Sequence, residues 1–214
     1  ASISGDGRYV VFRSDAGNLV GVNLQGVEEA FVKDLQTGAI EVASLNAAGQ
    51  LTGVGIVALS GQAISDDGRY VVYASNAGNI VPGVGSGTIQ VYVRDLATDT
   101  TTLASRSAAG AAANSQSDLG AISPNGRFVS FRSFATNLAG GPFASRVYVH
   151  DRVTLATSSV PLPPGAFLAA CNGEFQFGPA AFIEEKPQRY DRHAFAFDCR
   201  RQFVDLALVQ QQFA

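Results

Sequence analysis

Short apolar runs, bounded by Gly, Asn, Ser or Pro, make up most of the chain. One such run follows a tight turn and is written three times, as SGDGRYVVF at 4–12, SDDGRYVVY at 65–73 and SPNGRFVSF at 123–131. An Asp-Gly or Asn-Gly pair before aromatic and β-branched residues predicts a β-hairpin, because Gly supplies the positive φ of the turn. No stretch has the periodicity of an amphipathic helix, so the pattern predicts an all-β protein.

The three copies follow one another at intervals of about 60 residues, which is typical of a repeat architecture. With Gly7, Gly68 and Gly126 set in register, each repeat shows the same succession of short strands. The second strand is apolar on both faces, which favours a strand covered from both sides. The predicted strands, in the order first to fourth, are 2–4, 63–65 and 121–123; 9–12, 70–73 and 128–131; 30–35, 91–96 and 147–152; 40–44 and 101–105.

The third repeat is expected to lack its fourth strand, because Pro161, Pro163 and Pro164 interrupt the sequence there. The composition also changes at this point, from Ala, Ser and Thr to Phe, Gln and Arg. The sequence therefore predicts three repeats in 1–159, at about 1–58, 59–117 and 118–159, and a divergent segment in 160–214.

The divergent segment contains a faint echo of the repeat. Arg189-Tyr190 lies close to where Arg127-Phe128 would recur, and an alternating apolar pattern follows it. The segment is therefore a degenerate fourth repeat or an unrelated cap. A closed propeller needs at least about four blades, so three repeats would close with this segment, pair with a second copy in a homodimer, or belong to a longer propeller.

Four antiparallel strands per repeat are typical of a propeller blade. SDDGRYVVY, followed by VYVRDL, a short turn and TTLAS, resembles the TolB-type propeller repeat of bacterial envelope proteins and of propeller domains attached to some peptidases. The resemblance covers residues 1–159. It implies a β-propeller-like array of four-stranded antiparallel blades and a secreted or periplasmic protein, but it implies no single activity.

Composition argues against several classes of function. Lys+Arg 15 against Asp+Glu 18 leaves a net charge of −3, so no basic excess predicts nucleic-acid binding. No apolar run approaches the roughly 20 residues of a membrane span. His150 and His193 are too few for a histidine-rich metal site, and Glu28 and Glu29 are the only acids in the loops at 21–29, 82–90 and 140–146, which argues against calcium. We predict no metal and no cofactor.

The repeated turn is interpreted as structural: Ser caps it, Asp or Asn accepts backbone N–H bonds, and Gly takes the positive φ. The pairs Lys33-Asp34, Arg94-Asp95 and His150-Asp151 end the third strands. We expect them to form turn hydrogen bonds or ion pairs between blades. His150 beside Asp151 could act as a base, but no nucleophile or metal partner is marked, so no catalytic residue is predicted.

Candidate binding residues lie in the longer loops, which gather at the end of the strands away from the short turns. Asn18, Asn79 and Asn137 recur there, and Asn23 lies in the same loop as Asn18. The alternative is that each Asn only tolerates an unusual loop conformation while its Leu or Ile neighbour fills the blade interface.

The two cysteines, Cys171 and Cys199, both lie in the divergent segment. They could form a disulfide in an oxidising compartment or remain buried thiols.

These patterns predict a non-catalytic scaffold in a bacterial secreted or envelope protein, with a protein or a carbohydrate as partner. Two alternatives stay open. The chain could be an accessory propeller of a larger hydrolase or peptidase, or it could be a carbohydrate-binding propeller, although it has no Trp to stack on a sugar.

Overall fold

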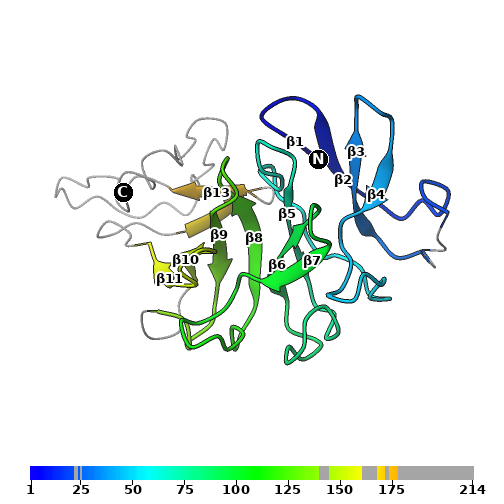
Figure 1. Ribbon diagram of the computed structural model, residues 1–214. Helices are drawn as coiled ribbons and strands as arrows, with labels where there is room; N and C mark the ends of the chain where they lie inside the picture. The colour runs from blue at the N-terminus through cyan, green and yellow to red at the C-terminus, as the bar shows by residue number, and fades with distance from the viewer. Residues whose placement is uncertain (22–23, 25, 140–144, 161–167, 172–173, 178–214) are drawn as a thin grey trace, which may run out of the picture. The chain divides into compact units, whose positions relative to one another are not determined.

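The computed structural model describes residues 1–160 apart from 22–23, 25 and 140–144, and then residues 168–171 and 174–177. The chain divides into two compact units, Ala1–Val160 and Pro161–Ala214. The described residues form antiparallel sheets without a helix (Figure 1). Among them, therefore, no helix has the length and apolar character needed to cross a membrane.

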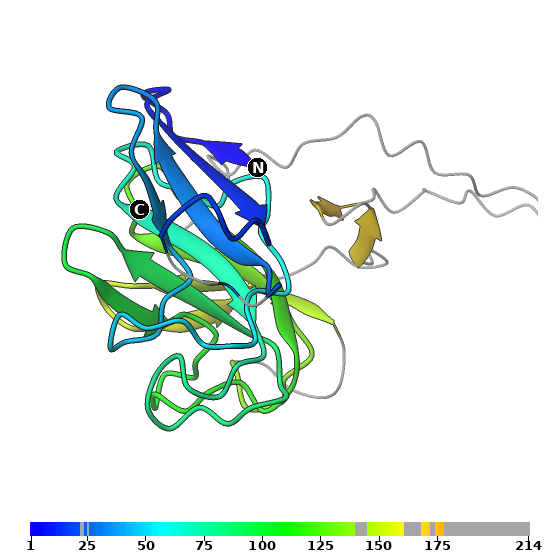
Figure 2. The same cartoon turned by 90° about the vertical axis from the view of Figure 1, so that its right-hand side faces the viewer.

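The first and third repeats each form a four-stranded sheet in which strands pair in chain order. This confirms the predicted four-stranded antiparallel unit for the first repeat. The first sheet, which faces the viewer in Figure 2, consists of β1 (Ser2–Ile3), β2 (Tyr9–Ser14), β3 (Glu29–Asp34) and β4 (Ile40–Val42). The third sheet consists of β8 (Ser117–Ile122), β9 (Phe128–Ser133), β10 (Arg146–Asp151) and β11 (Thr157–Ser159).

The expectation that the third repeat lacks its fourth strand is wrong. β11 pairs with β10, with Ser159 opposite Tyr148. The prolines do not prevent this pairing, because the strand ends at Ser159, before Pro161. The predicted boundary between 117 and 118 also falls inside β8, which begins at Ser117.

The second repeat forms a three-stranded sheet of β5 (Tyr70–Ser75), β6 (Gln90–Asp95) and β7 (Thr100–Leu103). Its predicted first strand is reduced to isolated bridges, Ile64 with Val71 and Ala58 with Ala74. A turn at 61–62 separates the two bridges. In the third repeat the matching residues, 119–120, remain within β8, and the pairing of β8 with β9 is irregular there, between Asp118 and Ala121.

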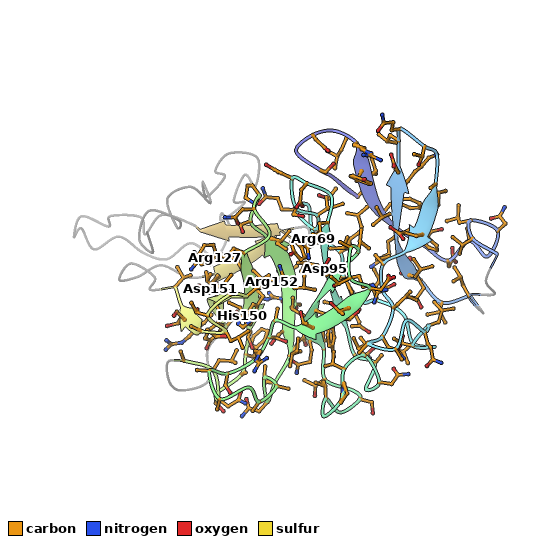
Figure 3. All side chains as sticks on the ribbon, in the orientation of Figure 1. Arg69, Asp95, Arg127, His150, Asp151 and Arg152 are labelled. Carbon is orange, nitrogen blue, oxygen red and sulfur yellow. The ribbon has the colours of Figure 1, made fainter. Side chains whose placement is uncertain are left out.

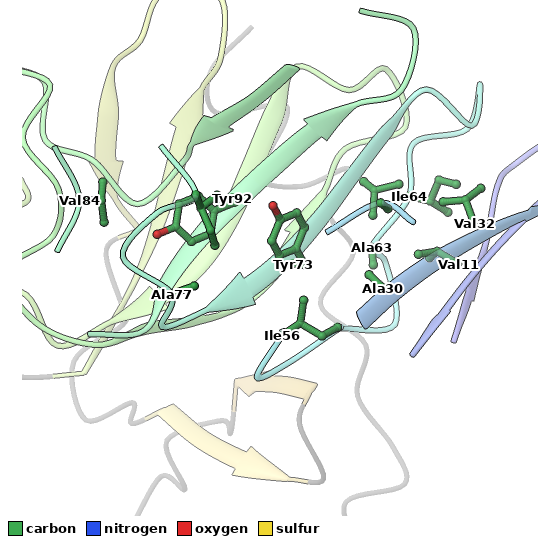
Figure 4. Close-up of a cluster of buried hydrophobic side chains, with 13 residues drawn as sticks. Val11, Ala30, Val32, Ile56, Ala63, Ile64, Tyr73, Ala77, Val84 and Tyr92 are labelled. Atoms are coloured by element: carbon green, nitrogen blue, oxygen red, sulfur yellow. The ribbon is translucent and has the colours of Figure 1, made fainter. Parts of the chain in front are cut away.

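The core lies between successive sheets, with the second sheet between the first and the third (Figure 1). Tyr73 and Tyr92 of the second sheet belong to one apolar cluster with Val11 and Val32 of the first (Figure 4). The other face of the second sheet packs against the third in a separate cluster. That cluster includes Val72, Val91, Val93, Val129, Phe131 and Tyr148. The second strands are apolar on both faces because each face meets a different neighbour.

Side chains also join successive sheets by hydrogen bonds. The Thr101 hydroxyl of the second sheet donates to the Leu45 carbonyl of the first repeat at 2.8 Å. The Thr157 hydroxyl of the third sheet donates to the Arg106 carbonyl of the second repeat at 2.6 Å. The repeats therefore use equivalent positions to hold one sheet against the next.

In the second unit, β12 (Leu168–Cys171) pairs with β13 (Glu174–Phe177) in a two-stranded antiparallel sheet. The predicted echo at Arg189-Tyr190 lies outside the described residues. The prediction of a degenerate fourth repeat therefore stays a prediction.

Candidate functional site

The repeated turn holds its polar side chains in one local network. In the first sheet the Ser4 hydroxyl donates to Asp6 Oδ1 at 2.5 Å, and Asp6 accepts the Arg8 backbone N–H at 2.9 Å. The Tyr9 backbone N–H donates back to Ser4 Oγ at 2.9 Å. These bonds give the turn a fixed geometry, in which Gly7 takes a φ of 72°.

The same network recurs at the other two turns. Ser65 donates to Asp67 at 2.5 Å, and Ser123 donates to Asn125 at 2.8 Å. Because Asn replaces Asp without loss of the bonds, the turn needs an acceptor oxygen rather than a charge. The structural interpretation of the motif is confirmed.

Each turn arginine forms a bidentate ion pair with an aspartate of its own sheet, the last residue of β3, β6 or β10. Arg69 reaches Asp95 with Nε–Oδ1 at 2.8 Å and Nη2–Oδ2 at 2.7 Å (Figure 3). The equivalent pairs are Arg8 with Asp34 and Arg127 with Asp151. These pairs tie the two short turns of one sheet together, so these aspartates do not form the ion pairs between blades that were one expectation for them. The other expectation, hydrogen bonds within the turn, is confirmed.

Hydrogen bonds from these arginines hold the aspartate pKa values below the ordinary range, for Asp95 at about 2. The pKa of Asp34 and that of Asp151 are lowered by the same cause. Each carboxylate also accepts backbone N–H bonds of the following turn, as Asp95 does from Ala97 at 3.0 Å. The aspartates therefore remain ionised near neutral pH and act as fixed acceptors.

In the first and second repeats, the aromatic residue after the turn arginine contacts the turn of the next sheet. A Cβ at Gly68 would overlap the Tyr9 ring, and one at Gly126 would overlap the Tyr70 ring. The guanidinium group of Arg152 covers Tyr70 at 3.9 Å from its centroid and donates to the Gly126 carbonyl at 2.5 Å. The turn glycine thus has a second role, which is to let a ring pack against its backbone.

Arg94 of β6 and His150 of β10 face the preceding sheet. Arg94 is 2% exposed, and its guanidinium bonds to Asp99 Oδ1 at 2.8 Å. The His150 Nδ1 lies 3.0 Å from the Thr157 hydroxyl, and burial lowers the pKa of the imidazole to about 4. Near neutral pH this histidine is an uncharged, buried side chain. That position gives it no open approach for a substrate.

The candidate asparagines lie in the longer loops, which leave the strands at the end away from the short turns. Asn18 and Asn79 are exposed. The Asn79 amide lies 3.4 Å from the Thr52 carbonyl, a long hydrogen bond. Asn23 lies outside the described residues.

Asn137 connects two loops. Its side-chain oxygen accepts the Asn114 backbone N–H at 3.0 Å, and its amide donates to the Ala112 carbonyl at 2.7 Å. The side-chain amide of Asn114 in turn donates to the Thr136 hydroxyl at 2.8 Å, and its side-chain oxygen accepts the Thr136 backbone N–H at 2.9 Å. The structure therefore gives Asn137 a role in holding loops together. The neighbours Ile80 and Leu138 are buried in the two clusters between the sheets, as the alternative interpretation expects of them.

Comparisons with known proteins leave the family open. No protein-family model matches the chain. No curated protein matches it either. Among solved structures, the crystal structure of the tricorn protease is similar over 77% of this chain and 13% of that chain, with 17% identity and a TM-score of 0.41. This chain therefore spans a small part of that protein.

Sequence reasoning missed a buried polar position at the start of β3 and β6. The Ser44 hydroxyl donates to Glu29 Oε2 at 2.5 Å, and the Ser105 hydroxyl donates to Gln90 Oε1 at 2.6 Å. Burial raises the pKa of Glu29, which is 1% exposed. The signal was available, because Glu29 and Gln90 occupy the same register and a serine follows each at the same interval.

The remaining candidate sites are not assembled by the described residues. Within these residues, no group of three or more His, Cys, Asp or Glu side chains could hold a metal ion. Cys171 belongs to β12, and Cys199 lies outside the described residues. Their disulfide stays a prediction.

Proposed function

We propose that the chain is a propeller-type, non-catalytic scaffold of a bacterial secreted or envelope protein, and that it binds a partner on its long-loop end. The observation that carries this proposal is the use of the repeated polar groups. Each turn serine, each turn arginine and each third-strand aspartate is bonded within its own sheet. The most conspicuous chemistry of the chain therefore supports the scaffold.

The long-loop end supports the other half of the proposal. Rigid sheets hold these loops, and exposed polar side chains such as Asn18 and Asn79 occur there. The short-turn end has fixed, short connections whose recurring serine, arginine and aspartate side chains already have partners. A binding partner is therefore expected where the loops vary most in length and sequence between repeats.

The proposal is tested by affinity capture of partners from a bacterial envelope fraction. Asn79→Arg places a charge on the long-loop end, and Gln36→Arg, at an exposed position of the β3–β4 turn, is the matched control on the short-turn end. Capture should be lost with Asn79→Arg and kept with Gln36→Arg. Loss with Gln36→Arg alone, or hydrolase activity of the isolated chain, would contradict the proposal.

One observation favours a carbohydrate as the partner. Phe134, at the long-loop end of β9, is 37% exposed and is flanked by Arg132, whose guanidinium lies 5.4 Å from the ring centroid. An exposed aromatic ring beside a polar loop residue suits stacking on a sugar, and the Phe134 backbone N–H donates to the Gln116 carbonyl at 3.0 Å. A sugar that raises the melting temperature of the chain, but not of Phe134→Ala, would support this candidate.

A further inference from the structure

The first sheet has an outer face, defined here by Val10, Phe12, Lys33, Leu35 and Ile40, that points away from the second sheet. Figure 2 looks onto this side of the sheet. The five residues are all partly or largely exposed, with Leu35 at 51%. Four of them are apolar, so this part of the face presents apolar surface to solvent. Phe31 and Glu29, which lie opposite Phe12 and Ser14 on the same face, are buried.

In the second sheet, the residues at the matching positions are buried or partly buried. Val71 and Tyr73, which match Val10 and Phe12, are at most 1% exposed because they pack against the first sheet. Arg94, in the register of Lys33, is 2% exposed, and Leu96, in that of Leu35, packs against the same cluster. The outer face is thus the repeat of an interface that the chain already forms twice.

In the second and third sheets, the matching face is covered by the preceding sheet, which places an aromatic ring on the turn glycine. Tyr9 packs on Gly68, and Tyr70 packs on Gly126. Apart from its two chain neighbours, no described residue lies within 4 Å of a Cβ placed at Gly7, although this glycine has the same turn and φ. Among the described residues, no aromatic ring packs on Gly7 as Tyr9 packs on Gly68 and Tyr70 packs on Gly126.

The third sheet carries the matching ring. Phe128 occupies the register of Tyr9 and Tyr70, points away from the second sheet and is partly exposed. Arg127 lies over the ring at 4.8 Å from its centroid, as Arg8 lies over Tyr9. None of the described glycines has the Phe128 ring against its Cα.

We propose that the third sheet of a second copy of this chain covers the outer face of the first sheet, with Phe128 of the partner copy on Gly7. The relation is reciprocal, so two copies would close into one ring through two equivalent interfaces. Three sheets from each copy give six, within the range of about four to eight blades in closed propellers. This inference rests on the proposed propeller-type scaffold.

Complementary variants test the proposal on the full chain by light scattering coupled to size exclusion. Leu35→Glu places a charge on the outer face of the first sheet, and Phe128→Glu places one on the aromatic side of the third. The wild-type chain should elute with twice the mass of one chain. Each variant alone should elute as a monomer, with a dimer dissociation constant raised roughly thirtyfold or more.

The decisive step is to mix the two variants. In a mixed pair, the unchanged Phe128 side of one copy meets the unchanged Leu35 face of the other, so one of the two interfaces is restored. The mixture should therefore form a dimer that neither variant forms alone. If the two variants stay monomeric when mixed, the head-to-tail arrangement is wrong.

Controls separate assembly from folding. Val153→Glu adds the same charge at a 72% exposed position of the β10–β11 turn and should leave the dimer intact. Ser130→Glu, two residues from Phe128 and on the same side of β9, should weaken the dimer even if Phe128→Glu fails to fold. A monomeric wild-type chain, or a dimer that Phe128→Glu leaves unchanged, would overturn the proposal.

These outcomes also separate this inference from the proposed function. A folded monomer that still captures its partner through the long loops would reject the dimer and leave the scaffold in place. A dimer without any partner would reject the proposed binding role and leave the assembly in place.

Discussion

Glu29 and Gln90 show how one register position is filled by two side chains of nearly equal shape. Both are 1% exposed, and both accept a serine hydroxyl. The Gln90 amide also donates to the Ala113 carbonyl at 2.7 Å. The carboxyl group of Glu29 meets the same burial, which disfavours its charged form and raises its pKa.

Glu29→Gln is therefore expected to stabilise the protein at neutral pH, by on the order of 1 kcal/mol for a satisfied neutral side chain. A carboxyl whose pKa is raised in the folded state lowers the stability of the protein as the pH rises through that pKa, because the unfolded chain ionises more readily. The gain should thus shrink as the pH falls to about 4. Urea unfolding at several pH values measures it.

The neighbouring Glu28 provides the control for this experiment. It is exposed and forms a surface ion pair with Arg13 at 2.9 Å. Glu28→Gln should change the free energy of unfolding by less than about 0.5 kcal/mol. An equal effect of both substitutions would show that burial does not set the behaviour of Glu29.

Asn137 and Asn79 separate loop structure from binding. Asn137→Ala removes two hydrogen bonds between loops, so it should lower the free energy of unfolding by about 1 kcal/mol. Asn79→Ala removes one long contact and should cost less. Thermal unfolding of the two variants measures the difference, and equal losses would contradict the structural role given to Asn137.

At the scale of the element, the turn glycine combines a backbone requirement with a packing requirement. Gly68 has a φ of 73° and the Tyr9 ring against its Cα. Gly49 has a φ of 74°, and a Cβ there would meet nothing. The two positions therefore share the backbone strain of an Ala substitution and differ in the ring.

Gly68→Ala should destabilise the protein by roughly 2–3 kcal/mol, because strain and overlap with Tyr9 act together. Gly49→Ala should cost only about 1 kcal/mol, from the strain alone. Chemical denaturation of both variants gives the comparison. Similar losses at the two positions would mean that the ring contact between sheets contributes nothing measurable.

The hairpins were predictable because their signals are local. The turn Ser-x-Asp-Gly-Arg, with Asn in place of Asp in the third repeat, and the apolar run after it fix β1–β2 and β8–β9 within a few residues. The fate of Ala63-Ile64-Ser65 was not predictable, since a turn at 61–62 interrupts the pairing along β5. The strand that begins at Thr157 was missed because the prolines show only where strand pairing must end. They do not show that a strand of three residues can still pair before them.

Of the candidate site, the sequence located the loops and the structural nature of the turn. It could not show that Asp34, Asp95 and Asp151 pair with arginines of their own sheets, because that pairing depends on both short turns meeting at one end. The role of Asn137 was equally hidden, since its partners at 112–114 belong to the preceding loop.

For the molecule as a whole, each repeat of the unit 1–160 packs on the next through an aromatic ring and a turn glycine. Stability along the array then depends on nearest-neighbour contacts between sheets, as in other repeat proteins. Within the part of the chain that the structure describes, Gly7 of the first sheet and Phe128 of the third have no partner in this contact. The same contact thus joins the sheets of the unit 1–160 and is the contact that we propose between two copies of the chain.

Nuclear Overhauser measurements on isotope-labelled protein test this claim most directly. The account predicts cross-peaks from the Tyr9 ring protons to the α-protons of Gly68, and from the Tyr70 ring protons to those of Gly126. Gly49 should show no aromatic cross-peak. Absence of both tyrosine–glycine contacts in the folded protein would contradict the account.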